Sequence, residues 1–237
     1  MSGNIDYIFF DCMETLVDLV QLPDLRDYAR WGYEGSGVER YWTDFEEFFE
    51  GYNAARKAIS QKLPEYREYE MYERFRFICR GKLSGADDLV VESVAGKIYK
   101  NYWKTYMSKS YLRDDVKEVV PALSKRYNLG VVSNFMVAGG IEELLKLNGI
   151  YDCFRFVVTS INVGWRKPHP EIYKTALSKA GVKPANIIFV GDDYVNDHDG
   201  PIAMGMRPVY LDRFKRHRDM PDRIESLYEL EDMLGKA

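Results

Sequence analysis

Short apolar segments alternate with helical patterns along most of this chain. Five apolar runs are bounded by polar residues, glycine or proline and are rich in β-branched or aromatic side chains: residues 5–10, 129–132, 154–158, 187–190 and 208–211. Segments with helical periodicity follow or precede them: residues 114–127, 137–148, 170–180, 196–204 and 226–234. Strands that alternate with helices predict βαβ units, and therefore an α/β fold with a parallel sheet.

A long segment between the first two runs interrupts this alternation. Its apolar and aromatic residues recur every three or four positions, as in Tyr41, Trp42, Phe45, Phe48, Phe49, Tyr52, Ala55 and Ile59, in Tyr66, Tyr69, Tyr72 and Phe75, and in Val91, Val94, Ile98, Tyr102 and Tyr106. Such stripes are typical of buried helix faces. We therefore expect an α/β core at residues 1–15 and 112–237, with an all-helical domain inserted at residues 16–111.

The composition agrees with a folded, soluble protein. The chain has 237 residues, 46% of them apolar and 30% charged, which excludes disordered and low-complexity classes. No apolar run is long enough to span a membrane, and the acidic segment at residues 1–14 does not resemble a signal peptide. A net charge of −4 argues against a dedicated nucleic-acid-binding protein.

The cysteines and one basic cluster do not indicate a further binding site. Cys12, Cys79 and Cys153 are far apart, which favours the reducing cytoplasm over a disulfide-bonded or zinc-binding protein. The cluster Arg213, Lys215, Arg216 and Arg218 is interpreted as a solvated loop.

Chemically useful residues follow several of the predicted strands. Asp11 follows the first strand, Ser133 and Asn134 follow the second, and Lys167 lies in the loop after the third. The fourth strand is followed by an acidic group, Asp192, Asp193 and Asp197. Ligands of open parallel sheets bind beyond the carboxyl ends of the strands, so we expect these residues to meet. Grouped carboxylates suit Mg²⁺, and an aspartate can form a phosphoaspartyl intermediate.

These positions resemble the four motifs of the haloacid dehalogenase superfamily. The motifs are residues 9–18 (FFDCMETLVD), 132–134 (VSN), 167–173 (KPHPEIY) and 190–197 (VGDDYVND). The resemblance implies a Rossmann-like core with a helical C1-type cap. It also implies that Asp11 is the nucleophile, that Ser133 and Asn134 bind phosphate with Lys167, and that Asp11, the Met13 backbone carbonyl, Asp192, Asp193 and Asp197 hold or support Mg²⁺.

One position departs from the family pattern. Most phosphatases of the superfamily carry a second aspartate two residues after the nucleophile, which protonates the leaving group and then activates water. This chain has Met13 there, and Glu14 follows it. Loss of a general acid/base typically costs about 10²–10⁴-fold in rate.

The expected function is a Mg²⁺-dependent phosphatase, made slow by Met13, that acts on a small phosphorylated metabolite. One alternative is a metal-independent 2-haloacid dehalogenase, since those enzymes also lack the second aspartate. Another is a binding or regulatory protein with weak catalysis. The oligomeric state stays open, as does the substrate.

Residues of the inserted domain are candidates for choosing the substrate. Its aromatic candidates can equally pack between helices: Trp31, Tyr33, Trp42 and Trp103. Arg26, Arg30 and Arg40 either pair with an anionic substrate or lie on a solvated face.

Overall fold

The fold is given by a computed structural model, which describes residues 4–215, 217, 220 and 222–235. The chain forms two compact units. One comprises Met1–Asp18 and Tyr111–Ala237, called the core unit below, and the other comprises Leu19–Ser110, called the helical unit.

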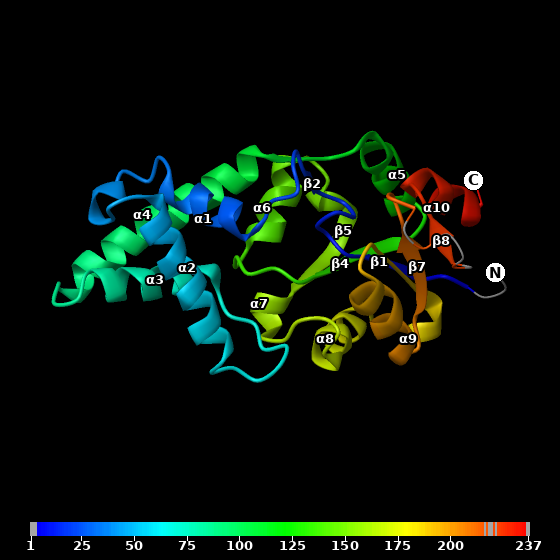
Figure 1. Cartoon of the computed structure of the whole chain (residues 1–237). Helices are drawn as coiled ribbons and strands as arrows, with labels where there is room; N and C mark the ends of the chain where they lie inside the picture. Colours follow the sequence, from blue (N-terminus) through cyan, green and yellow to red (C-terminus); the bar gives the residue numbers. More distant parts are fainter. Residues whose placement is uncertain (1–3, 216, 218–219, 221, 236–237) are drawn as a thin grey trace. The chain divides into compact units, whose positions relative to one another are not determined.

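The core unit is built on a six-stranded sheet in the order β5-β4-β1-β6-β7-β8 (Figure 1). Its strands are β1 (Tyr7–Phe10), β4 (Asn128–Ser133), β5 (Phe154–Thr159), β6 (Ile187–Gly191), β7 (Arg207–Leu211) and β8 (Arg223–Ile224). All neighbouring strands pair in parallel. The α/β class with a parallel sheet is therefore confirmed.

The pairing of the central strand β1 with its two neighbours determines where Asp11 lies relative to the ends of β4 and β6. Phe10 pairs with Val131 of β4 on one side and with Val190 of β6 on the other. Asp11 therefore lies level with the last residues of both neighbouring strands. The sheet brings the ends of three strands together, as their parallel direction requires.

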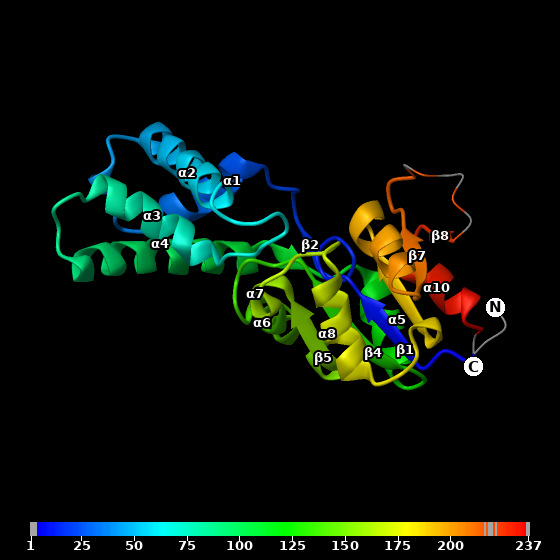
Figure 2. The same cartoon turned by 90° about the horizontal axis from the view of Figure 1, so that it is seen from below.

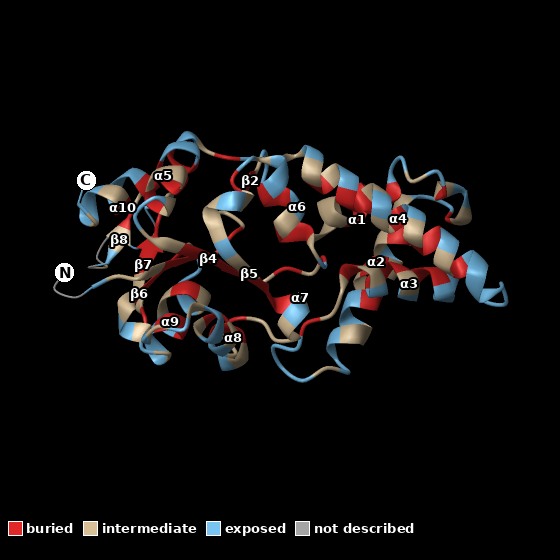
Figure 3. Ribbon diagram, turned by 180° about the vertical axis from the view of Figure 1, so that it is seen from behind, coloured by how far each residue is buried: buried red, intermediate tan, exposed pale blue. Residues whose placement is uncertain are grey.

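Helices cover both faces of this sheet. They are α5 (Asp114–Ser124), α6 (Gly140–Leu147), α7 (Ser160–Val163), α8 (Pro170–Ala180), α9 (Gly200–Ala203) and α10 (Leu227–Met233). In Figure 1, α5 and α10 lie on one side of the sheet, whereas α8 and α9 lie on the other. Phe9, Val158 and Phe189 pack with Ile172 and Tyr173 of α8 in one buried cluster, and Figure 3 colours much of the central sheet as buried.

The predicted elements agree closely with this core, with one exception. The helix expected at residues 196–204 is instead a single π-helical turn (Tyr194–Asp199) followed by the short helix α9. The turn begins where the Asp193 side chain accepts a hydrogen bond from the Asn196 backbone N–H at 2.9 Å. π-helical turns are rare and often occur at functional sites.

The helical unit contains α1 (Leu25–Tyr33), α2 (Phe45–Ser60), α3 (Met71–Lys82), α4 (Asp88–Ser108) and a short 3₁₀ turn at Glu39–Tyr41 (Figure 2). Its aromatic candidates are buried in packing between these elements: Trp31, Tyr33, Trp42 and Trp103. Arg26 pairs with Glu46, and Arg30 pairs with Glu34. The interpretation of the aromatic stripes as core holds fully for α4. In the α2 stripe, Phe45, Phe49 and Ile59 are only half-buried, and Tyr66 is exposed and precedes α3.

The boundaries between the two units differ slightly from those expected. The first falls after Asp18 instead of after residue 15, and the second falls after Ser110 instead of after residue 111. Residues after Cys12 fold back, because the backbone N–H groups of Leu16 and Val17 both donate to the Cys12 carbonyl. Asp18 is buried and pairs with Arg113 at 2.7 Å. These contacts keep residues 16–18 with the core unit. Beside them, the short strands β2 (Asp18–Leu19) and β3 (Ser110–Tyr111) form a two-stranded sheet.

Within the described part of the chain, every helix is either too short or too polar to traverse a lipid bilayer.

Close packing in the sheet gives a first prediction. A Cβ atom at Gly130 of β4 would lie 2.6 Å from the Phe156 ring of β5. We expect Gly130→Ala to lower the free energy of unfolding by about 1–3 kcal/mol, because overpacking forces the ring to move. Urea unfolding followed by circular dichroism measures this loss.

Gly96→Ala is the matched control. A Cβ atom there meets nothing within 4 Å, and the position lies inside α4. We expect this change to stabilise its helix by about 0.5–1 kcal/mol. Equal effects of the two substitutions would contradict the packing argument.

Candidate active site

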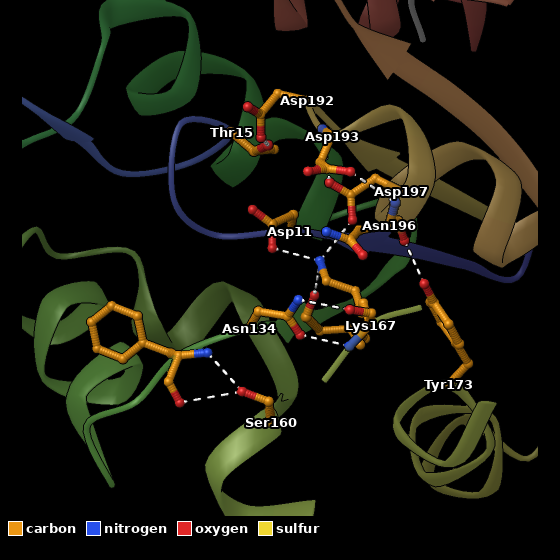
Figure 4. Close-up of polar contacts among 12 residues, drawn as sticks. Asp11, Thr15, Asn134, Ser160, Lys167, Tyr173, Asp192, Asp193, Asn196 and Asp197 are labelled. Carbon is orange, nitrogen blue, oxygen red and sulfur yellow. Dashed lines mark hydrogen bonds and ion pairs between the residues drawn. The ribbon is translucent and has the colours of Figure 1, made fainter. Parts of the chain in front are cut away.

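Three buried or half-buried carboxylates converge at the end of the central strands (Figure 4). Asp11 follows β1, Asp192 follows β6, and Asp197 lies in the π-helical turn. One carboxylate oxygen from each lies within 4.8 Å of the others. Oxygen atoms grouped in this way suit a hard cation such as Mg²⁺.

Lys167 ties this acidic cluster together. Its ammonium group lies 2.6 Å from Asp11 Oδ1, 2.6 Å from Asp197 Oδ1 and 2.9 Å from the Val132 carbonyl oxygen. The lysine is only 3% exposed, so these three acceptors satisfy its three N–H donors away from water. The structure thus brings Lys167 into direct contact with Asp11, 156 residues away in the sequence.

Burial and mutual repulsion shift the acid–base behaviour of the cluster. Burial alone would lower the pKa of Lys167, but Asp11 and Asp197 outweigh this effect and hold the pKa above its ordinary value. Burial, followed by the charges of Asp11, Asp197 and Glu14, raises the pKa of Asp192 to about 8. Burial also raises the pKa of Asp197 to about 7, although Lys167 opposes the shift. Full ionisation of all three carboxylates would therefore place more negative charge in the cluster than one lysine can compensate.

A glycine makes the close approach of Asp197 possible. A Cβ atom at Gly191 would lie 2.3 Å from a carboxylate oxygen of Asp197. Asp197 Oδ2 also accepts a hydrogen bond from the Asp193 backbone N–H at 3.1 Å. The Asp193 side chain is exposed and begins the π-helical turn, so it does not belong to the three-carboxylate group.

The last residue of β4, Ser133, and the residue after it, Asn134, have different surroundings. Ser133 is 1% exposed, and its hydroxyl has no hydrogen-bond partner among the residues that the structure describes. Asn134, in contrast, makes two bonds with the Lys167 backbone: its Oδ1 accepts from the N–H at 2.7 Å, and its Nδ2 donates to the carbonyl at 3.1 Å. Asn134 therefore holds the loop that carries Lys167, whereas Ser133 retains an unused polar group.

Two residues with no role assigned from the sequence support this arrangement. Thr15 is fully buried, and its hydroxyl donates to Asp192 Oδ1 at 3.2 Å. Ser160, at the end of β5, accepts a hydrogen bond from the Phe135 backbone N–H at 2.8 Å and so fixes the loop after β4. Both residues come after predicted strands. This position was the only feature of the sequence that could have indicated a role for either residue.

Met13 and Glu14 lie in a tight loop after the first strand. Glu14 adopts a left-handed backbone conformation with φ of 61°, which favours glycine, and its N–H donates to the Val17 carbonyl. Glu14, Asp192 and Arg213 line a small cavity of about 20 Å³. The loop thus places a second acidic side chain beside Asp192.

The basic cluster after β7 is not simply a solvated loop. The Arg213 side chain is only 9% exposed and pairs with Asp115 at 2.8 Å, so the expectation was wrong for this residue. Lys215 is exposed and pairs with Glu225. Arg216 and Arg218 lie outside the described residues.

Comparisons with known proteins agree with this geometry. The sequence profile of the haloacid dehalogenase-like hydrolases matches residues 45–210. The chain is also 32% identical over 247 residues to haloacid dehalogenase-like hydrolase domain-containing protein 3 of Danio rerio, covering 97% of this chain and 96% of that protein. This chain belongs to the haloacid dehalogenase-like hydrolase family. The resemblance drawn from the four motifs is therefore confirmed, and the protein is a hydrolase of this family.

Two further proteins are similar to this chain over most of their length. The glyceraldehyde 3-phosphate phosphatase of Methanothermobacter thermautotrophicus is 38% identical over 204 residues, covering 86% of this chain and 84% of that enzyme. The crystal structure of a 2-haloacid dehalogenase from Pseudomonas syringae has a TM-score of 0.78 at 20% identity and covers 97% of this chain and 98% of that one. The latter shows a shared fold.

The raised pKa values give a prediction about stability. A carboxyl group whose pKa is higher in the folded than in the unfolded chain stabilises the fold at low pH, and this contribution is lost as the pH rises through the folded value. With the pKa of Asp192 at about 8 and that of Asp197 at about 7, the melting temperature in EDTA should fall from about pH 5 to about pH 8. Differential scanning calorimetry across this range measures the trend.

Asp192→Asn should flatten this pH dependence, because asparagine does not ionise. Asp152→Asn, at an exposed position of the same unit, should retain it. A melting temperature that rises over this interval in EDTA would contradict the assignment of raised pKa values.

Proposed function

We propose that this protein is a Mg²⁺-dependent phosphatase that hydrolyses a small phosphorylated metabolite through an aspartyl-phosphate intermediate. The observation that carries the proposal is the group of Asp11, Asp192 and Asp197 around the Lys167 ammonium. When all three carboxylates are ionised, one lysine leaves the site net negative, and a divalent cation would neutralise this excess.

The donor set fits Mg²⁺. Asp11 and Asp192 would supply carboxylate oxygens, the Met13 carbonyl would add a backbone oxygen, and Asp197 would hold the metal or its waters, whereas the exposed Asp193, which caps the π-helical turn, would not be a ligand. Once bound, the ion would neutralise phosphoryl oxygens and polarise the phosphorus. The high pKa of Asp192 in the metal-free protein agrees with a group arranged to face positive charge.

Asp11 would act as the nucleophile. A carboxylate oxygen forms a bond to phosphorus, the ester P–O bond breaks, and the leaving oxygen departs with the bonding electron pair. Water then attacks the phosphorus of the aspartyl phosphate, which releases phosphate and restores Asp11. The Lys167 ammonium holds Asp11 in place for the first step through a hydrogen bond to Oδ1 at 2.6 Å.

Ser133 would bind a phosphate oxygen. Its buried hydroxyl lacks a partner within the described structure, and it ends β4, which pairs with the strand that Asp11 follows. An ordered phosphate oxygen would satisfy this donor. The Asn134 side chain is already engaged with Lys167, so its backbone N–H is the group we propose for phosphate.

Met13 limits the rate. It cannot protonate the leaving oxygen, which would take its proton from solvent instead. Esters with good leaving groups need little protonation and should be the better substrates. Similarity to the glyceraldehyde 3-phosphate phosphatase of Methanothermobacter thermautotrophicus supports a small phosphorylated substrate. Glyceraldehyde 3-phosphate should therefore be among the first substrates assayed.

The cysteines also bear on the cellular compartment of the protein. The cysteines Cys12, Cys79 and Cys153 are all free, which favours a reducing compartment such as the cytoplasm. We propose small-molecule substrates rather than nucleic acid or membrane partners.

A nucleophile substitution tests the proposal. Asp11→Asn should lower phosphate release from p-nitrophenyl phosphate by at least about 1,000-fold, because the intermediate cannot form. EDTA should abolish wild-type release, and Mg²⁺ should restore it. Asp152→Asn is the control, since it removes an exposed carboxylate of the same unit.

Undiminished release by Asp11→Asn would overturn the proposal. So would halide release from 2-chloropropionate in EDTA without any phosphate release, because that outcome identifies a dehalogenase. Tight binding of a metabolite without turnover would identify a binding protein.

Restoring the missing acid gives a second test. Met13→Asp should raise kcat on alkyl phosphates by about 10²–10⁴-fold, since an acid/base group typically contributes that much. The gain on p-nitrophenyl phosphate should be smaller, because its leaving group needs less protonation. Met13→Asn has nearly the shape of the aspartate variant without its acid and should give no gain; equal gains would contradict the explanation.

A further inference from the structure

Arg213 links three segments that are distant in sequence. It follows β7, and its Nη1 lies 2.8 Å from Asp115 Oδ2 on α5. Its Nη2 donates to the Thr15 carbonyl at 3.3 Å. The Arg213 and Asp115 side chains are 9% and 6% exposed, so this pair is shielded from water.

Asp115 is itself firmly held. Its Oδ2 accepts the Leu227 backbone N–H at 2.8 Å, at the start of α10, and its Oδ1 accepts the N–H of the next residue at 3.0 Å. Arg213 is thus attached to an anchor formed by two helices. A charged hydrogen bond to a fixed carboxylate restricts the guanidinium to one orientation.

Thr15 connects this anchor to the acidic cluster. Its carbonyl accepts from Arg213, while its hydroxyl donates to Asp192 Oδ1 at 3.2 Å. Thr15 is fully buried in a loop closed by two hydrogen bonds to the Cys12 carbonyl. Because the carbonyl and side chain belong to one residue in a tight loop, a shift at Arg213 would move the hydroxyl that orients Asp192.

A second observation associates Arg213 with the same carboxylate. Arg213 and Asp192 line the cavity of about 20 Å³ together with Glu14 and Asp212, which is large enough for one water molecule. Arg213 Nε is a buried donor with no partner in the described part of the protein.

We propose that Arg213 is a positioning residue for the metal site, acting through Thr15 to hold Asp192 in its orientation. This inference rests on the proposed Mg²⁺-dependent function. It assigns the chain Asp115–Arg213–Thr15–Asp192 to the support of a metal ligand. Residues that orient metal ligands commonly change metal affinity when they are replaced.

The test measures Mg²⁺ binding to the metal-free protein by isothermal titration calorimetry. Arg213→Lys keeps the positive charge but cannot bond both Asp115 and Thr15 in the same fork. Thr15→Val removes the hydroxyl and keeps the shape. Each should weaken Mg²⁺ binding about tenfold, the lower end of the range for such supporting residues. The double variant should lose little more than either single one, because both act on the same carboxylate.

Arg113→Lys is the matched control. It makes the same substitution in another arginine of the core unit, which pairs with Asp18 at 2.7 Å and has no bond to Thr15. Its Mg²⁺ affinity should stay within about twofold of wild type, since it supports no metal ligand. Asp115→Asn provides a second route if Arg213→Lys does not fold, because it loosens the anchor while keeping the arginine, and it should also weaken Mg²⁺ binding.

The outcomes distinguish failure of the proposed Mg²⁺-dependent function from failure of the proposed role of Arg213. Wild-type protein that fails to bind Mg²⁺ overturns the proposed function. Wild-type protein that binds Mg²⁺ while Arg213→Lys or Asp115→Asn binds it equally well overturns the role of Arg213 alone. Fully additive losses in Arg213→Lys and Thr15→Val also overturn it, since they would show that the two residues act separately.

Discussion

The site depends on balancing one buried ammonium against three carboxylates in a small volume. Lys167 contacts Asp11 and Asp197 at 2.6 Å and is nearly inaccessible to water. Such an arrangement persists only where the rest of the fold fixes each partner, because unpaired buried charges are strongly destabilising. The parallel sheet supplies that constraint by ending β1, β4 and β6 at one level. The three carboxylates outnumber the one ammonium, and the proposed divalent cation would offset this excess of acidic groups.

Hydrogen bonds from outside the cluster keep these charges in place. Asn134 brackets the Lys167 backbone, and Ser160 fixes the loop after β4. Gly191 leaves room for Asp197, since any Cβ atom there would collide with its carboxylate. The chemistry is therefore confined to a few side chains, but their geometry depends on many loop contacts.

The sequence predicted the core fold and the meeting of Asp11, Lys167, Asp192 and Asp197 because both follow from short-range rules. Apolar runs mark buried strands, and residues after parallel strands share one edge. The roles of Thr15, Ser160 and Arg213 were not predictable in this way. Their contacts depend on the paths of loops, and Arg213 reaches Asp115 from 98 residues away. The π-helical turn was likewise missed, because residues 196–204 have an ordinary helical pattern that the Asp193 cap and Asp197 contacts override.

The central position of β1 also has a consequence for biosynthesis. This strand is made first, yet its two neighbours begin at residues 128 and 187. At a synthesis rate of about 5–20 residues per second, Phe10 waits roughly 9–35 s before Ile187 is made. The strand YIFF has both edges unpaired until β4 is made, and one edge stays unpaired until β6 is made. The nascent chain therefore exposes an unpaired strand early, and the helices of residues 19–110, which pack on one another within that segment, can fold before β6 is made.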